Sequence, residues 1–183
     1  QSHQGVCADA IATLEGIDRG TLDALAAESQ ARAARAIAEG RFDKSLIPVL
    51  NLDGTVALDQ EQFPRPGTTA ESLAALPASF PQIADYRHND NPTFRELINQ
   101  KYPDLDIAHV HHAGNSSGVV DGAAAILLAS EGYAKAHGLT ARARIVATAN
   151  MGDDPTLMLN APVPAARKVL ARAGLTLGDI DLF

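Results

Sequence analysis

Residues 107–125 read IAHVHHAGNSSGVVDGAAA, and this stretch decides the fold class. Its beginning is strand-like, and the small and polar residues 113–118 that follow are typical of a loop. The alanine-rich run 121–137 carries large apolar side chains and is closed by Gly138, a pattern that predicts a helix. Strand, loop and helix in this order indicate a layered α/β protein.

The other predicted elements lie on both sides of this stretch. Residues 18–39 place apolar side chains at spacings of three and four, with Asp18 as the N-cap and Gly40 as a left-handed end, and predict the clearest helix. β-Branched residues at 143–148 predict a buried strand. The remaining expectations are a hairpin of strands 46–50 and 55–58, short helices over 71–76 and 94–101, a helix over 162–174, a helical turn from Thr176 and the start of a strand at 180–183.

Prolines interrupt two further segments. Pro64 and Pro66 hold Arg65 on a stiff loop. Four prolines divide residues 77–108, which are the least patterned part of the chain and are predicted to form an excursion on the surface.

The composition excludes several classes of protein. The chain has 183 residues, and Asp plus Glu number 22 against 15 Lys plus Arg, a net charge of -7 that argues against binding to nucleic acid or to an anionic membrane. No apolar run is long enough to insert into a membrane, so we expect a soluble, cytoplasmic, globular protein. The single cysteine, Cys7, excludes an internal disulfide and a cysteine-rich metal site. Because the chain begins at Gln1 and ends on an apolar residue, Phe183, we also expect it to be a piece of a longer protein.

Three places carry residues of chemical interest. On a strand, His109 and His111 would share one face within reach of a metal ion, but no third ligand follows at a suggestive spacing, so ordinary strand histidines are favoured and no metal is expected. Cys7 lacks a glycine elbow, which favours an inert buried thiol over a nucleophile. The loop 114–118 either lets a ligand approach the backbone or packs tightly beneath a neighbouring layer, and spacing alone leaves both open.

The run from His112 to Ala125 resembles the thiolase family's segment A-G-N-S-S-G-x-x-D-G-A-A-A. Further blocks resemble the family in the same order: SQARAA at 29–34 with GRF at 40–42, PRPGTTAESL at 64–73, GDDPTLM at 152–158, and APVPA at 161–165 leading to AGL at 173–175 and DIDLF at 179–183. The resemblance implies part of a thiolase-like layered α/β fold. It assigns residues 1–118 to part of the loop domain that covers coenzyme A, and 119–183 to the start of the C-terminal half of the core.

Thiolases transfer an acyl group between coenzyme A and a carbon nucleophile, forming acetoacetyl-CoA or cleaving a 3-ketoacyl-CoA. One thiolate carries the acyl group as a thioester while another group moves the proton at the α-carbon. The family's motifs for these groups, among them N-E-A-F and G-H-P, do not occur in this sequence, and Cys7 matches none of its catalytic cysteines. We therefore expect a central segment without catalytic residues, inactive alone, whose contribution is the binding of coenzyme A or acetyl-CoA as substrate, with no cofactor required.

The resemblance also implies which residues meet coenzyme A. Arg65 matches the arginine that approaches the nucleotide end, although an exposed loop arginine is the plain alternative. Ser72 and Ser117 match serines that line the coenzyme A tunnel, with Ser117 reaching the pantetheine, although such hydroxyls are often helix or loop caps. His3 matches the histidine beside the pantetheine arm, and Phe80 an apolar wall residue that could equally be core.

Gly114 completes this set, because it would let the backbone approach the ligand. Departures from the family pattern at Gln4, 81–108 and 159–160 concern the acyl pocket and its surroundings. The family also implies a homodimer or homotetramer. The alternatives are a non-catalytic thiolase-like coenzyme A or lipid-binding protein, and an interaction module of a fatty-acid β-oxidation complex that docks through 81–108.

Overall fold

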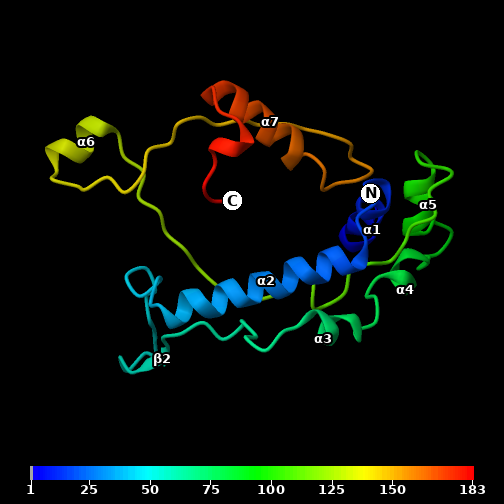
Figure 1. The fold of residues 1–183 in the computed structure, drawn as a ribbon, viewed down its shortest axis with the longest axis horizontal. Coiled ribbons are helices and arrows are strands. Elements are labelled where there is room, and N and C mark those ends of the chain that lie inside the picture. Colours follow the sequence, from blue (N-terminus) through cyan, green and yellow to red (C-terminus); the bar gives the residue numbers. More distant parts are fainter. Residues whose placement is uncertain (1) are drawn as a thin grey trace. The chain divides into compact units, whose positions relative to one another are not determined.

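The computed structural model describes residues 2–183 and divides the chain into two compact units, 1–118 and 119–183 (Figure 1). The elements of the first unit are α1 (Gln4–Leu14), α2 (Arg19–Ala38), β1 (Val49–Leu50), β2 (Val56–Leu58), α3 (Ala70–Ala74), α4 (Pro81–Ala84) and α5 (Phe94–Asn99). Those of the second unit are α6 (Glu131–Ala136), α7 (Pro162–Ala173) and the 3-10 helix η1 (Leu177–Asp179). Within the described residues, no helix has the length and apolar character needed to cross a membrane.

Helix α2 forms where its pattern predicts it. The Asp18 side chain accepts a hydrogen bond from the Thr21 N–H at 2.7 Å, and this bond satisfies one of the donors that the first helical turn leaves open. At the other end Gly40 adopts φ +63°, and the Arg41 N–H donates to the Ala36 carbonyl at 3.0 Å. This left-handed ending is the one that glycine favours, so the predicted helix and both of its signals are confirmed.

The core of the first unit lies where α1 packs against α4 and α5. Val6, Cys7 and Ala10 of α1 are fully buried, together with Ala84 of α4 and Ile98 of α5. The sequence analysis missed α1, whose N-cap is His3 instead of the usual hydroxyl or carboxylate residue. Most of the segment 77–108, predicted to form an excursion on the surface, is exposed or half-buried, but its residues Ala84 and Ile98 contribute to this core.

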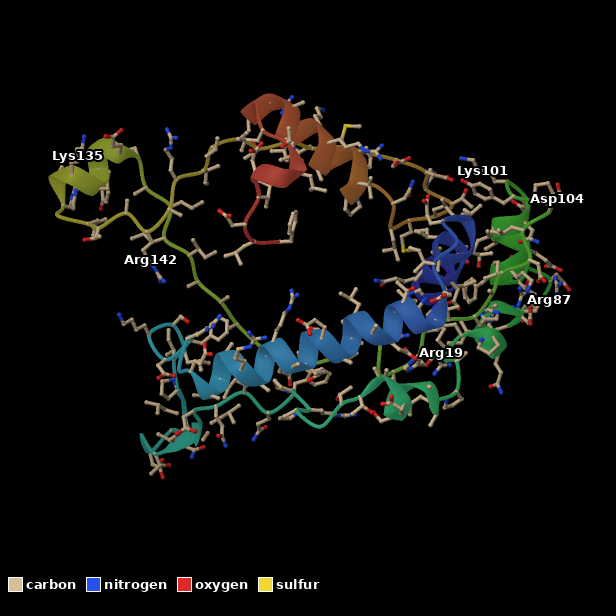
Figure 2. The ribbon with its side chains drawn as sticks, viewed as in Figure 1. Arg19, Arg87, Lys101, Asp104, Lys135 and Arg142 are labelled. Carbon is tan, nitrogen blue, oxygen red and sulfur yellow. The ribbon has the colours of Figure 1, made fainter. Side chains whose placement is uncertain are left out.

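Helix α3 lies against α2 and is closed at its start by a capping box. The Thr69 side chain accepts from the Ser72 N–H at 3.2 Å, while the Ser72 hydroxyl accepts from the Thr69 N–H at 3.0 Å. Leu73 is buried, and Arg19 at the start of α2 donates to the Leu73 and Leu76 carbonyls at 2.8 and 2.6 Å (Figure 2). The helix predicted over 71–76 is confirmed, and its C-terminus is tied to α2.

The predicted hairpin is also confirmed, although its strands are shorter than expected. β1 and β2 are antiparallel, with Val49 opposite Leu58 and Leu50 opposite Val56. The turn between them is closed by a hydrogen bond from the Asn51 N–H to the Thr55 carbonyl at 2.8 Å. Both strands are exposed throughout.

Three predicted strands and most of one helix are wrong in the described chain. Residues 107–111, 143–148 and 180–183 join no ladder, because β1 and β2 form the only sheet among residues 2–183. A strand requires a hydrogen-bonded neighbour, which no local pattern supplies. The helix predicted over 121–137 is reduced to α6, and the side chains of 126–128 are 71–85% exposed, so they provide no packed face to stabilise the earlier turns.

The end of the second unit follows its sequence signals closely. Helix α7 begins at Pro162, whose missing N–H costs nothing in the first turn, and stops at Gly174 with φ +68°. The helical turn predicted from Thr176 is η1, and the Thr176 N–H donates to the Asp179 carboxylate at 2.7 Å. Both elements confirm the prediction.

Candidate ligand pocket

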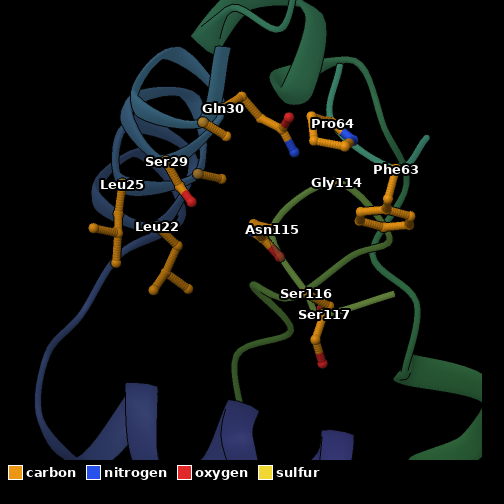
Figure 3. A pocket seen from close by; sticks show the side chains of 12 residues that line it. Leu22, Leu25, Ser29, Gln30, Phe63, Pro64, Gly114, Asn115, Ser116 and Ser117 are labelled. Atoms are coloured by element: carbon orange, nitrogen blue, oxygen red, sulfur yellow. The ribbon is translucent and has the colours of Figure 1, made fainter. Parts of the chain in front are cut away.

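A pocket of about 420 Å³ lies in the first unit, between α2, the loop at Phe63–Pro64 and the loop 114–117 (Figure 3). Helix α2 contributes a mainly apolar wall with Leu22, Leu25, Ala26 and Ala33. The volume of the pocket falls within the range of small-molecule sites. Helix α2 can form this wall because its residues at spacings of three and four share one face.

Five other lining side chains are polar but uncharged, and Phe63 and Pro64 add to the apolar part of the lining. Ser29 and Gln30 come from α2, and Asn115, Ser116 and Ser117 come from the opposite loop (Figure 3). Hydroxyl and amide groups can both donate and accept hydrogen bonds. Among the described residues, no charged side chain lines the pocket, so it is suited to a neutral group that has both polar and apolar parts.

Glycines let the two loops approach their neighbours. A Cβ at Gly114 would collide with the side chains of Leu73 and Leu76, and one at Gly118 would collide with the Phe63 ring. The loop therefore packs tightly against its neighbours at both glycines. It can also meet a ligand, since Gly114 lines the pocket as well.

A buried carboxylate, Asp23, lies at the base of the loop. It accepts hydrogen bonds from His112 Nε2 at 2.7 Å, Asn115 Nδ2 at 2.9 Å and Arg19 Nε at 3.3 Å. Burial alone raises the pKa of Asp23, but these three hydrogen bonds outweigh it, and the net pKa lies below the ordinary 3.8. Asp23 is therefore an ionised acceptor that joins α2 to the loop.

The hydrogen bonds of His112 assign its tautomer. Its Nδ1 accepts from the Gly114 N–H at 3.1 Å, and its Nε2 faces the Asp23 carboxylate. A ring with an acceptor at Nδ1 and a donor at Nε2 is the neutral Nε2–H form. His112 is fully buried and so holds Gly114 and Asp23 together within the protein interior.

A second buried carboxylate, Asp9 on α1, receives four hydrogen bonds. Two come from the Nδ1 atoms of His109 and His111, both at 2.7 Å, and two from the N–H groups of Val110 and His111 at 3.1 and 3.0 Å. Burial alone raises the pKa of Asp9, but the hydrogen bonds reverse this effect and lower it below 3.8. Arg95 completes the group, with its guanidinium 3.0 Å from His109 Nε2.

This arrangement bears on two candidates from the sequence. His109 and His111 do lie close together, and both contact the Asp9 carboxylate. Within residues 2–183, no group of three His, Cys, Asp or Glu side chains could hold a metal ion. Cys7 is fully buried on α1, which is consistent with the expected inert thiol. The histidines therefore serve the packing of α1.

The structure separates the predicted coenzyme A residues into two groups. Gly114 and Ser117 line the pocket. Arg65 is exposed directly after Pro64 at the pocket rim, and its N–H donates to Gln30 Oε1 at 2.6 Å, which fixes the proline loop to α2. The Ser72 hydroxyl is engaged in the α3 capping box.

His3 and Phe80 form the other group, and neither lines this pocket. Their ring centroids are 5.7 Å apart, and the centroid of the Phe94 ring lies 5.8 Å from that of His3. His3 Nδ1 accepts from the Gly5 N–H at 3.2 Å, and Phe80 occupies the space that a Gly5 side chain would need. Contact of either residue with coenzyme A stays a prediction.

Sequence reasoning missed the two aspartates. Both are single carboxylates flanked in sequence by apolar residues: Asp9 by Ala8 and Ala10, and Asp23 by Leu22 and Ala24. An acidic residue on a buried face requires several donors, and the histidines at 109–112 were the available ones. The sequence shows these isolated carboxylates, but it does not show which distant residues donate to them.

Comparison with known proteins gives a consistent family. A model of the thiolase N-terminal domain matches residues 1–83, and a model of the thiolase C-terminal domain matches residues 139–183. Acetyl-CoA acetyltransferase from Escherichia coli is 39% identical over 98% of this chain and 40% of its own length. A 3-ketoacyl-CoA thiolase from Vibrio cholerae is 41% identical over 97% of this chain and 41% of its own length.

Solved structures agree with this result. Human mitochondrial 3-ketoacyl-CoA thiolase matches with a TM-score of 0.75 and 33% identity, over 97% of this chain and 39% of the human one. Bacillus anthracis acetyl-CoA acetyltransferase matches with a TM-score of 0.75 and 32% identity, over 100% of this chain and 40% of its own. The chain thus has part of the thiolase fold and spans about two fifths of the length of these relatives. On the evidence of its motifs, its two domain matches and its structural neighbours, the chain belongs to the thiolase family.

Proposed function

We propose that the protein containing this chain transfers an acetyl or acyl group between coenzyme A and a carbon nucleophile, by forming acetoacetyl-CoA or by thiolysis of a 3-ketoacyl-CoA. In this proposal residues 1–118 belong to the loop domain over coenzyme A, and 119–183 begin the C-terminal half of the core. The observation that carries it is the pocket lined by Gly114 and Ser117, within the segment that matches the thiolase motif.

The chemistry of the pocket supports coenzyme A as its ligand. The pantetheine arm is an elongated, neutral chain of methylenes and two amides, which fits an uncharged pocket with an apolar wall on α2 and polar groups opposite. In the proposed pose the Ser117 hydroxyl contacts a pantetheine amide. Gly114 leaves room for the arm along the loop backbone.

Arg65 is proposed to meet the nucleotide end. Its guanidinium is exposed, while its backbone is fixed by the prolines on both sides and by Gln30. A guanidinium can bind phosphate with paired hydrogen bonds or stack on adenine. Ser72 lies in the first turn of α3 and is proposed to line the same tunnel.

His3 and Phe80 are proposed to lie beside the pantetheine arm near its thiol end. Because His3 Nδ1 already accepts from Gly5, its Nε2 is the nitrogen that carries the proton and can donate. The Phe80 and Phe94 rings both lie close to the His3 ring and restrict its orientation.

The chemical steps require groups that this chain does not offer in the pocket. A thiolate must carry the acyl group, a base must move the α-proton, and donors must stabilise the enolate oxygen. Residues 1–183 are proposed to bind the substrate, and alone to be inactive. Coenzyme A enters as a substrate, and no resident cofactor is required.

The wider setting is proposed from the family. The assembly would be a homodimer or homotetramer in the cytoplasm, without binding to nucleic acid, and association with a β-oxidation complex is the partner hypothesis. The acidic composition, with a net charge of -7, supports the exclusion of nucleic acid.

The test uses the natural protein that contains these residues. Calorimetric titration with coenzyme A measures binding, and the decrease in acetoacetyl-CoA in the presence of coenzyme A measures thiolysis. Binding together with turnover supports the proposal. Binding without turnover would favour a non-catalytic coenzyme A-binding protein, and the absence of both would contradict the proposed function.

A further inference from the structure

We infer that Asp23 is a positioning residue of the coenzyme A pocket: acting through His112 and Asn115, its carboxylate holds the loop 114–117 in the shape that receives the ligand. This inference rests on the proposed function. Asp23 does not line the pocket, and only 3% of its surface is exposed. Its effect on a ligand must therefore pass through the residues that it holds.

The carboxylate joins the two walls of the pocket. Asp23 lies on α2 next to Leu22, which lines the pocket, and it accepts hydrogen bonds from both ends of the 112–115 turn. Asn115 divides its amide between three partners: Nδ2 donates to Asp23 and to the Val110 carbonyl at 3.1 Å, and Oδ1 accepts from the His112 N–H at 2.8 Å. The turn that precedes Ser116 and Ser117 is thereby fixed.

The same carboxylate reaches α3. Arg19, which donates to Asp23, also donates to the carbonyls of Leu73 and Leu76, and these two side chains pack against Gly114. Displacement of Asp23 would therefore weaken both the hydrogen bonds to His112 and Asn115 and the packing of α3 against Gly114. No other carboxylate shares in this network, as far as the described chain shows.

His112 provides a specific test of this arrangement. It does not line the pocket, and its two nitrogens have separate tasks: Nε2 donates to Asp23 and Nδ1 accepts from Gly114. The amide nitrogen of glutamine can occupy the place of Nε2, whereas the shorter asparagine can serve only Gly114. H112Q and H112N are thus matched amides that keep or lose the bond to Asp23.

The experiment compares both variants in the natural protein. H112N should weaken the binding of coenzyme A by about tenfold, because the buried Asp23 carboxylate loses one of its donors and the loop loses this tether to α2. H112Q should restore binding to within about threefold of wild type, because the glutamine N–H replaces the imidazole N–H as the donor to the Asp23 carboxylate. The increase in KM for coenzyme A should exceed the decrease in kcat, and melting temperatures recorded beside it separate global destabilisation from repositioning.

Asp23 itself is tested with D23N, with D59N as the control that removes a charge from an exposed aspartate of the same unit. D23N should raise KM for coenzyme A, and D59N should leave it unchanged. Hydrogen exchange of the amides 113–118 should be faster in D23N and H112N than in wild type and H112Q. Equal exchange and equal binding in H112N and H112Q would overturn the inference.

Two outcomes separate this inference from the function on which it rests. If wild type binds no coenzyme A, the proposed function fails, and faster loop exchange in H112N than in H112Q would still show that Asp23 positions the loop. If H112N and D23N do not fold, nitrogen NMR of wild type decides. A neutral Nε2–H ring for His112 supports the network, and an Nδ1–H ring or an imidazolium would overturn it.

Discussion

Asp9 and Asp23 lie on different helices, and each receives hydrogen bonds from histidines of the stretch 109–112. Around Asp9, the bonds join α1 to the chain that follows α5, in the region with the most completely buried side chains. Around Asp23, they join α2 to a loop that lines a pocket. The same chemical device thus stabilises the fold in one region and shapes a candidate site in the other.

The surroundings of the two carboxylates explain this difference. Asp9 is fully buried, and its four donors come from a single segment, residues 109–111, in the chain after α5. Asp23 has three donors from two segments: Arg19 on α2, and His112 and Asn115 in the 112–115 turn that continues into Ser116 and Ser117. Loss of Asp9 should therefore appear mainly in stability, and loss of groups near Asp23 mainly in ligand binding.

Asp9→Asn should have the largest effect on stability. A single amide cannot accept from two imidazoles and two backbone N–H groups, and removing the charge should lower the free energy of unfolding by about 3 kcal/mol. Denaturant titration measures this change. D90N removes an exposed carboxylate from the 81–108 segment and should cost under about 0.5 kcal/mol. Equal stability of both variants would contradict the proposed contribution of Asp9 to the stability of the fold.

The pH dependence of stability follows from the same carboxylates. Their folded pKa values lie below the ordinary 3.8, so their contribution is fully present above that pH and is lost as the pH falls through the folded pKa. Stability measured by denaturant titration should therefore decline below about pH 4, and D9N should show a shallower decline. A D9N profile parallel to wild type would contradict the lowered pKa of Asp9.

Gly114→Ala should cost about 2 kcal/mol of stability, because its Cβ would meet Leu73 and Leu76 in a packed contact. Gly67→Ala is the matched control: it lies in the proline loop of the same unit, where a Cβ would meet nothing within 4 Å. Thermal unfolding of the two variants compares them directly. A loss of stability in G67A as large as that in G114A would show that loss of glycine, and not crowding, is responsible.

Ser117→Tyr should obstruct the pocket and raise KM for coenzyme A by about tenfold or more, as expected for the loss of well-fitted contacts. Ser117→Ala keeps the space and removes one hydroxyl, so its KM should rise only about threefold to fivefold. Steady-state thiolysis with varied coenzyme A provides both values. Unchanged kinetics in S117Y would remove Ser117 from the site.

Arg65→Met should have the smallest effect, raising KM for coenzyme A by about threefold, because an exposed charge contact contributes little. The effect should disappear when N-acetylcysteamine, which lacks the nucleotide, replaces coenzyme A as the attacking thiol. Kinetics with the two thiols at low and high salt tests this point. An increase in KM that is equal for both thiols would place Arg65 elsewhere than at the nucleotide.

Elements whose signals lie within a few residues of them could be predicted from the sequence, whereas elements that depend on distant residues could not. Asp18 and Gly40 act within a few residues of themselves, and the helix ends that they mark are confirmed. The strands expected at 107–111 and 143–148 depend on a partner that no local pattern names, and they are absent from the described residues.

The same reason explains the candidate site. The loop 114–118 was found as a small-residue motif, and the pocket includes it. Asp9 and Asp23 were missed, because their donors stand about ninety to one hundred positions further along the chain. Family motifs identify residues that meet a ligand more readily than residues that hold those residues in place.

A crystal structure of the natural protein with coenzyme A would test most directly whether the region around Asp23 is a ligand site. We predict that the pantetheine arm lies between α2 and the loop 114–117, with an amide within hydrogen-bond distance of the Ser117 hydroxyl. Coenzyme A bound elsewhere, with this pocket filled only by solvent, would contradict that assignment.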